Sequence, residues 1–238
     1  MSDNLKKLAL NNNFDESIIR DAYLYACHKD VEAIKPGNVN INSPHHDTTA
    51  SDYLISSINS GSELFHDSYS LGDRILNAIV ATKKETSMNT NLGIVLLCAP
   101  IAHALLNYKE MSLKDAITKT IDNATSDDTV KICEAINIAN PGGLGDVLDY
   151  DTKSMPAVKL REIMSYSAQY DRISYQYHNN YQDILDFIIP SLDKNMIKYK
   201  SSDISISMTY LQILSKIPDS HISRKLGEEI AKKTSNHV

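Results

Sequence analysis

The segment from Leu92 to Leu106 constrains the fold more than any other part of the chain, because it is apolar on every side of a helix. A helix that is hydrophobic all round lies in the core of a globular protein or in a membrane. This segment of about 15 residues is shorter than the roughly 18 needed to span a bilayer. We therefore predict a buried central helix, kinked at Pro100, around which the other elements pack.

The rest of the chain is also predicted to be helical. Eight glycines and seven prolines in 238 residues are about half of average usage, which favours long helices over a many-turned β architecture. Apolar residues recur at helical spacing and predict helices that begin near Asp15, Thr49, Leu71, Ser112 and Asp127. Further helices are predicted over residues 156–178, 181–189, 203–216 and 220–233. The predicted fold class is all-α, with a flexible arm over residues 1–14 and a single multi-helix domain over residues 15–238.

Charge and cysteine content narrow the class of protein. The formal net charge is −6 and no basic run occurs, so the chain lacks the basic footprint that nucleic-acid binding requires. Three cysteines without a CxxC pair favour core thiols over a disulfide framework or a zinc cluster. The first residues contain neither a long apolar stretch nor a small-residue cleavage site. We expect a cytoplasmic protein that does not bind membranes.

Two polar clusters lie between the first two predicted helices. Lys35-Pro36-Gly37-Asn38 lets the backbone approach a ligand closely, and Lys35 could reach a phosphate, although Pro-Gly is also an ordinary turn after a helix. His45-His46-Asp47, with Asp52 five residues later, offers groups for a general base or a metal. A helix-capping aspartate beside solvated histidines would give the same pattern.

Two further clusters flank later helices. Asn89-Thr90-Asn91-Leu92-Gly93 precedes the central helix, where unpaired N–H groups and the macrodipole favour a polyphosphate. The last cluster runs from Asp127 through Glu134 to Gly142, Gly143 and Asp146, and its glycines could surround an anion. Its carboxylates suit Mg²⁺, so Asp127, Glu134 and Asp146 are the predicted metal ligands. A mobile loop with acidic caps is the alternative interpretation.

Taken in order, these motifs resemble the triphosphoribosyl-dephospho-CoA synthase family, in the form found in archaea and methylotrophic bacteria. The motifs are KPGNV, HHD followed by DY, LGDRIL, NTNLGIVLL, AINIANPGGLG and YDRI, and they extend from about Cys27 to Tyr181. The resemblance implies an all-α enzyme that transfers the triphosphoribosyl group of ATP to the 2′-hydroxyl of 3′-dephospho-CoA or a related acceptor, releasing adenine. It also implies a role in cofactor biosynthesis.

The resemblance assigns roles to individual residues. His45 and Asp47 match the family's His and Asp, and Asp47 is the predicted base, with Asp52 nearby. Asn89, Thr90, Asn91 and Gly93 match the family's helix-end segment, but Asn91 and Leu92 stand where the family has His and Lys. Because replacing lysine by leucine removes a positive charge, Lys35 and Arg74 are the predicted cations that compensate.

Two other functions stay open on the residues alone. His46-Asp47 could pair with His28 in an HD-type metal phosphohydrolase. Alternatively, the missing lysine at Leu92 would fit a nucleotide-binding protein without turnover. For the transferase we expect Lys35, Asp47, Asn89, Asn91 and Asp146 to converge on one cleft, with Mg²⁺, ATP and the acceptor as partners and a homodimer as one possible assembly.

Overall fold

The regular elements are helices throughout the computed structural model, which describes residues 14–44, 47–142 and 152–236. No strand occurs within these residues, which confirms the all-α prediction. The helices are α2 (Glu16–Glu32), α3 (Ala50–Leu64), α4 (Leu71–Glu85), α5 (Leu92–Asn107), α6 (Leu113–Asn123), α7 (Ser126–Ala139), η1 (Thr152–Ser154), α8 (Leu160–Ser167), α9 (Arg172–His178), η2 (Asp183–Ile188), α10 (Ile189–Tyr199), α11 (Ser202–Lys216), α12 (Ser220–Leu226) and α13 (Glu228–Asn236).

Several helices begin where the sequence supplies a capping side chain. Asp15 accepts a hydrogen bond from the backbone N–H of Ile18 at the start of α2, and Ser112 accepts from that of Asp115 at the start of α6. Both helices thus begin where the sequence predicts, at residue types that are favoured as caps. Helix α7 begins one residue before Asp127, because Thr125 and Asp128 form a capping box there.

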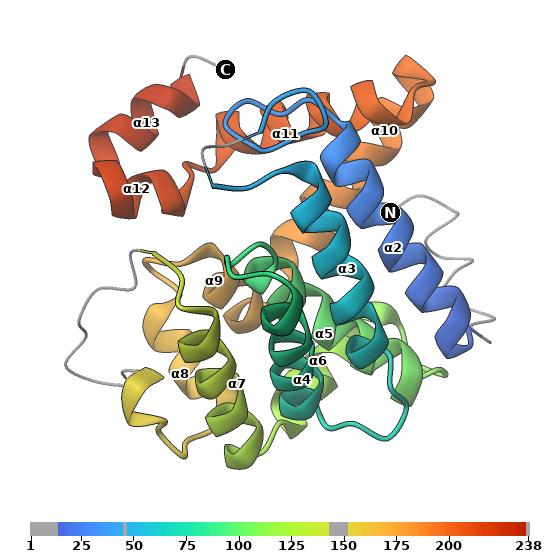
Figure 1. The fold of residues 1–238 in the computed structure, drawn as a ribbon, viewed down its shortest axis with the longest axis vertical. Helices are drawn as coiled ribbons and strands as arrows, with labels where there is room; N and C mark the ends of the chain where they lie inside the picture. Colours follow the sequence, from blue (N-terminus) through green and yellow to red (C-terminus); the bar gives the residue numbers. More distant parts are fainter. Residues whose placement is uncertain (1–13, 45–46, 143–151, 237–238) are drawn as a thin grey trace.

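Helices α3, α4, α5 and α7 form a bundle with two distinct ends (Figure 1). Hydrogen bonds join the start of α5 to the first half of α3 and the last turn of α4 through Asn91. At the opposite end, Arg74 in the first turn of α4 contacts the last residue of α3 and the second half of α5. We call these the Asn91 end and the Arg74 end. Helices α3 and α5 begin at the Asn91 end, whereas α4 and α7 finish there (Figure 1).

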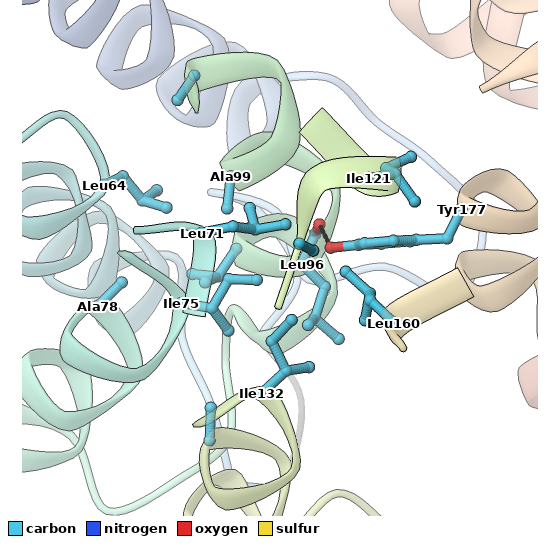
Figure 2. Packing of buried hydrophobic residues seen from close by; sticks show 14 of the residues in the cluster. Leu64, Leu71, Ile75, Ala78, Leu96, Ala99, Ile121, Ile132, Leu160 and Tyr177 are labelled. Carbon is cyan, nitrogen blue, oxygen red and sulfur yellow. Dashed lines mark hydrogen bonds between the residues drawn. The ribbon is translucent and has the colours of Figure 1, made fainter. Parts of the chain in front are cut away.

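The apolar core surrounds α5, as the sequence predicts (Figure 2). Val95, Ala99 and Ala104 have no solvent exposure. Helix α5 continues through Pro100, which has no N–H to donate to the carbonyl of Leu96. The buried hydroxyl of Tyr177 donates to that carbonyl instead, at 2.6 Å (Figure 2). A tyrosine on α9 thus satisfies a backbone group that the proline leaves unpaired.

Replacing Tyr177 with Phe is expected to lower the free energy of unfolding by about 1–3 kcal/mol, because the Leu96 carbonyl would remain buried and unpaired. In a Pro100→Ala background residue 100 regains its N–H, so the same replacement should cost less. Urea denaturation of the four proteins in this double-mutant cycle measures the difference. An equal cost in both backgrounds would contradict this role of Tyr177.

The C-terminal third departs from the predicted helix boundaries. The predicted helix over 156–178 is two helices, α8 and α9, and the one over 220–233 is divided at Gly227, whose φ of +94° favours glycine. The helix predicted to end at residue 189 continues to Tyr199. Pro190 lies in the first turn of α10, directly after the wider π-helical turns of η2. A proline is tolerated in the first turn of an α-helix. Inside an α-helix its ring would clash with the carbonyl four residues earlier, and the wider π-helical turns avoid this clash.

Candidate functional site

The Asn91 end contains a network of buried polar side chains. The amide nitrogen of Asn91 donates to the backbone carbonyl of Ser56 at 3.3 Å and to the hydroxyl of Thr82 at 3.0 Å. The hydroxyls of Ser56 and Thr90 also share a hydrogen bond. These four side chains are almost fully buried. They fix the start of α5 against α3 and α4, so part of the predicted ligand set has a positioning role.

The first turn of α5 retains groups that can bind an anion. The side chain of Asn89 accepts from the N–H of Leu92 at 3.2 Å, and the carbonyl of Asn91 accepts from that of Val95 at 2.9 Å. Within the described residues, no acceptor faces the N–H groups of Gly93 and Ile94. Such first-turn N–H groups, together with the helix macrodipole, favour a phosphate.

A shallow hollow lies beside this turn, with room for about one water molecule. It is lined by residues from α4, the connection to α5 and the end of α7, namely Ile79, Thr82, Lys83, Met88, Asn89, Asn91 and Ala139. Gly142, which follows α7, is exposed. The structure therefore brings the end of α7 to the Asn89–Asn91 segment, whereas Gly143 and Asp146 lie outside the described residues.

Asp47 and Asp52 lie at the start of α3 in different environments. The Asp52 carboxylate accepts hydrogen bonds from the backbone N–H and the hydroxyl of Thr49, each at 2.8 Å. These hydrogen bonds lower the pKa of Asp52 below its ordinary value. Asp47 is exposed, two residues before Thr49. Asp52 therefore caps α3, Asp47 is the more accessible carboxylate, and His45 lies outside the described residues.

The segment from Lys35 to Asn38 lies against α11. Lys35 is buried, and its ammonium group donates to the backbone carbonyl of Asp30 at 2.8 Å and to the Asp30 carboxylate. The carbonyl of Pro36 accepts from the hydroxyl of Tyr210 at 2.9 Å. Gly37 has a φ of +82° and is exposed, as is Asn38. In this arrangement the Lys35 charge is neutralised by a carboxylate within the protein.

Arg74 lies at the Arg74 end, and its side chain is fully buried. Its guanidinium donates to the carbonyls of Leu64 and Asp67, at 2.7 and 3.4 Å, and to Nδ1 of His103 at 3.4 Å. Burial lowers the pKa of Arg74 to about 10, so the group is still a cation at neutral pH. Arg74 fastens α3, α4 and α5 together and does not reach the Asn91 end, contrary to the expectation that it compensates for Leu92.

His103 should make folding stability depend on pH. Burial, and secondly the charge of Arg74, lower the pKa of His103 to about 4. An unfolded histidine titrates near 6.5, so the unfolded chain binds the extra proton first. The contribution of neutral His103 to the free energy of unfolding is fully present above about pH 6.5. It is lost as the pH falls towards 4, and the total loss is roughly 3 kcal/mol.

Denaturation of wild type and His103→Gln between pH 7 and 4 measures this contribution. In His103→Gln the free energy of unfolding should fall less steeply with decreasing pH than in the wild type. His178→Gln, at an exposed histidine, should match the wild type. Parallel curves for wild type and His103→Gln would contradict the depressed pKa.

The predicted metal ligands are not brought together within the described residues. Asp127 lies at the Arg74 end and pairs at 2.7 Å with Lys131, which also contacts Asp73 at 2.9 Å. Glu134 is exposed and lies about 10 Å further along α7, too far to share one ion with Asp127. No group of three His, Cys, Asp or Glu side chains suited to a metal occurs among the described residues.

Sequence reasoning missed Ser56, Thr82 and Lys83 at the Asn91 end. Ser56 belongs to a buried stripe of small residues on α3 that also contains Ser57, Ser60 and Gly61. That stripe, at helical spacing, was the available signal for a polar face packed inside the bundle. Thr82 ends an apolar stripe and Lys83 begins a polar stretch, and neither pattern by itself indicates a ligand.

A larger hollow of about 240 Å³ lies between α10 and α11. It is lined by Phe187, Ser191, Lys194, Asn195, Gln212, Ser215 and Lys216. None of the predicted site residues contributes to it. The hollow therefore marks no part of the site that the sequence predicts.

The fold thus defines an all-α protein whose candidate anion site lies where a buried central helix begins. The model of the CitG family, ATP:dephospho-CoA triphosphoribosyl transferase, matches residues 16–238, and the chain belongs to this family. This match confirms the family that the ordered motifs indicated. No helix in the described part of the chain is long and apolar enough to cross a membrane.

A solved structure shares the fold. It is the Archaeoglobus fulgidus protein named "putative triphosphoribosyl-dephospho-coA synthase", with a TM-score of 0.59 and 18% sequence identity. The alignment covers 76% of this chain and 78% of that one. At this identity the likeness establishes the fold alone. Comparison with curated protein sequences gave no match.

Proposed function

We propose that this protein transfers the triphosphoribosyl group of ATP to the 2′-hydroxyl of 3′-dephospho-CoA or a related acceptor and releases adenine. The observation that carries the proposal is the match of nearly the whole chain to the transferase family. The start of α5 supports it, because two first-turn N–H groups lie beside Asn89 and an open hollow. That combination suits a polyphosphate that is held but not cleaved.

The reaction is a glycosyl transfer at C1 of the ribose. The bond from C1 to adenine breaks while the acceptor oxygen forms a new bond to C1, so positive charge develops on the sugar. A base must take the proton of the acceptor hydroxyl, and adenine must gain a proton on the nitrogen that leaves C1, so that the two proton transfers balance. Asp47 is the proposed base because it is exposed at this end of the molecule, whereas the Asp52 carboxylate is occupied by Thr49.

The other residues at this end hold groups in place. The N–H groups of Gly93 and Ile94 would bind phosphate oxygens, and the exposed amide of Asn89 lies beside them. An added Cβ at Gly93 would lie 3.4 Å from Ile173 Cδ1, so this position of α5 packs closely against α9. The capping box of Asp52 and Thr49 fixes the start of α3, directly after Asp47. Each contribution positions the reactants, which lowers the entropic part of the barrier.

Magnesium remains an expectation for this reaction. The ligand set of Asp127, Glu134 and Asp146 does not fit one ion, because Asp127 and Glu134 are separated along α7 and Asp127 pairs with Lys131. Magnesium bound to a nucleotide is held largely by phosphate oxygens and water. The proposed mechanism therefore assigns no step to a metal held by these carboxylates.

Release of adenine tests the proposal. The protein is incubated with ATP, Mg²⁺ and 3′-dephospho-CoA, and adenine, ADP and phosphate are quantified by liquid chromatography. We expect adenine to appear only when all components are present. Release of phosphate or ADP without adenine would favour the HD-type phosphohydrolase, and ATP binding without any product would favour a nucleotide-binding protein without turnover.

A further inference from the structure

A positively charged side chain near the start of α5 would favour binding of the triphosphate, but none of the three positions considered from the sequence supplies one there. Leu92 is 7% exposed and packs in the core, in place of the lysine expected from the family resemblance. Lys35 is paired with Asp30, and Arg74 is buried at the other end of the bundle. A triphosphate carries several negative charges, so a cation from another position would strengthen its binding.

Lys83 meets this requirement by its position. It lies in the last turn of α4, next to Thr82, whose hydroxyl accepts from the amide of Asn91. Lys83 lines the same hollow as Asn89 and Asn91. A cation at this position therefore lies beside the groups that the proposed function assigns to phosphate binding.

The ammonium group of Lys83 is also available for a ligand. It donates to the backbone carbonyl of Ser87 at 2.6 Å, which occupies one of its three N–H donors. Among the described residues no carboxylate forms an ion pair with Lys83, whereas Lys131 contacts Asp73 and Asp127. Lys83 is exposed, so its charge is not buried, and no side chain in the described ranges neutralises it.

A simpler role would be compensation of the helix macrodipole, since lysines are favourable in a last turn. Lys84 occupies the same last turn, is exposed and carries the same charge. Only Lys83 lines the hollow with Asn89 and Asn91. The neighbouring lysine therefore serves as an internal control for every effect that depends on charge or dipole alone.

We propose that Lys83 binds a phosphate group of the nucleotide triphosphate and supplies the positive charge that Leu92 does not. The inference rests on the proposed function for the identity of the nucleotide. The contact itself requires only a polyphosphate at the start of α5. Lys83 would act as a substrate-binding residue, holding the triphosphate while the bond at C1 is exchanged.

Titration calorimetry of Lys83→Gln and Lys84→Gln tests this inference, with tripolyphosphate, ATP and adenosine as separate ligands. We expect Lys83→Gln to weaken binding of tripolyphosphate and ATP about tenfold, in line with one lost charged contact. Adenosine binding should be unchanged because it has no phosphate. Lys84→Gln should remain within about twofold of wild type, and Lys83→Arg should restore most of the affinity.

The outcomes separate this inference from the proposed function. Equal losses of affinity for tripolyphosphate and ATP in Lys83→Gln and Lys84→Gln would overturn the specific role of Lys83. Unchanged affinity in Lys83→Gln would overturn it as well, as would a wild type that binds neither phosphate ligand. If tripolyphosphate binding depends on Lys83 but wild type releases no adenine, the phosphate site stands and the transfer reaction is wrong. Higher salt should weaken the wild type more than Lys83→Gln, because an exposed ion contact is screened.

Discussion

Replacing Asp47 with Asn is expected to slow adenine release by roughly 10²–10⁴-fold, the usual contribution of a general base. The amide keeps the size of the carboxylate but cannot take the proton of the acceptor hydroxyl. ATP binding should change little, because the proposed phosphate contacts come from α5 and Lys83. Rate measurements on purified variants, together with calorimetry of ATP binding, separate the two steps.

Asp67→Asn is the matched control for the loss of one negative charge. Asp67 is exposed like Asp47 but lies at the Arg74 end, where its backbone carbonyl accepts from Arg74. Its replacement should leave adenine release near the wild-type rate. If Asp47→Asn instead abolished binding of Mg-ATP while the fold remained intact, Asp47 would be reassigned as a metal ligand. The phosphohydrolase alternative would then gain support.

Replacing Gly72 with Ala is expected to destabilise the fold by roughly 3 kcal/mol or more, in the range of severe overpacking. An added Cβ would lie 2.6 Å from the Cα of Asp128 and 2.9 Å from its carbonyl oxygen, both backbone atoms of α7. The N–H of Gly72 also donates to the Asp128 carboxylate at 2.8 Å. Helices α4 and α7 would have to separate, which would break this contact as well.

Gly61→Ala provides the comparison, because Gly61 is also buried within a helix. The nearest atom to its added Cβ is Leu24 Cδ2 at 3.5 Å, an ordinary contact with a side chain. Alanine is the better helix former, so this variant should be as stable as wild type or up to about 1 kcal/mol more stable. Thermal and urea unfolding of both variants measures the contrast. Equal stability of the two variants would contradict the close approach of α4 to α7.

Much of the fold could be predicted from local sequence patterns, namely apolar segments and helix-capping residues. The apolar surface of the Leu92–Leu106 segment predicts a central helix, and Asp15 and Ser112 predict helix starts, because each signal acts within a turn of helix. The C-terminal boundaries were harder to predict. Whether Pro190 ends a helix or lies in a first turn depends on the π-helical segment before it, which residue types alone do not reveal.

The candidate site could be predicted only in part, because helical spacing does not state which helix ends meet. Asn89, Asn91 and Gly93 were predicted from their place at the start of an apolar helix, and Asp47 from the polar cluster around it and the family resemblance. Arg74 is eight residues before Thr82, so about 12 Å of helix separates it from the Asn91 end. Asp127 likewise lies away from the Asn91 end, because α7 begins at the Arg74 end. Lys83 was not predicted, because its significance depends on the end of α4 meeting the start of α5.

Transfer of an intact triphosphoribosyl group is tested most directly by mass spectrometry of the acceptor. After incubation with ATP and Mg²⁺, 3′-dephospho-CoA is predicted to gain one ribose with all three phosphates, with one adenine released per acceptor modified. An acceptor that lacks the 2′-hydroxyl should remain unmodified. An unmodified 3′-dephospho-CoA, accompanied by ADP or free phosphate from ATP, would contradict the account.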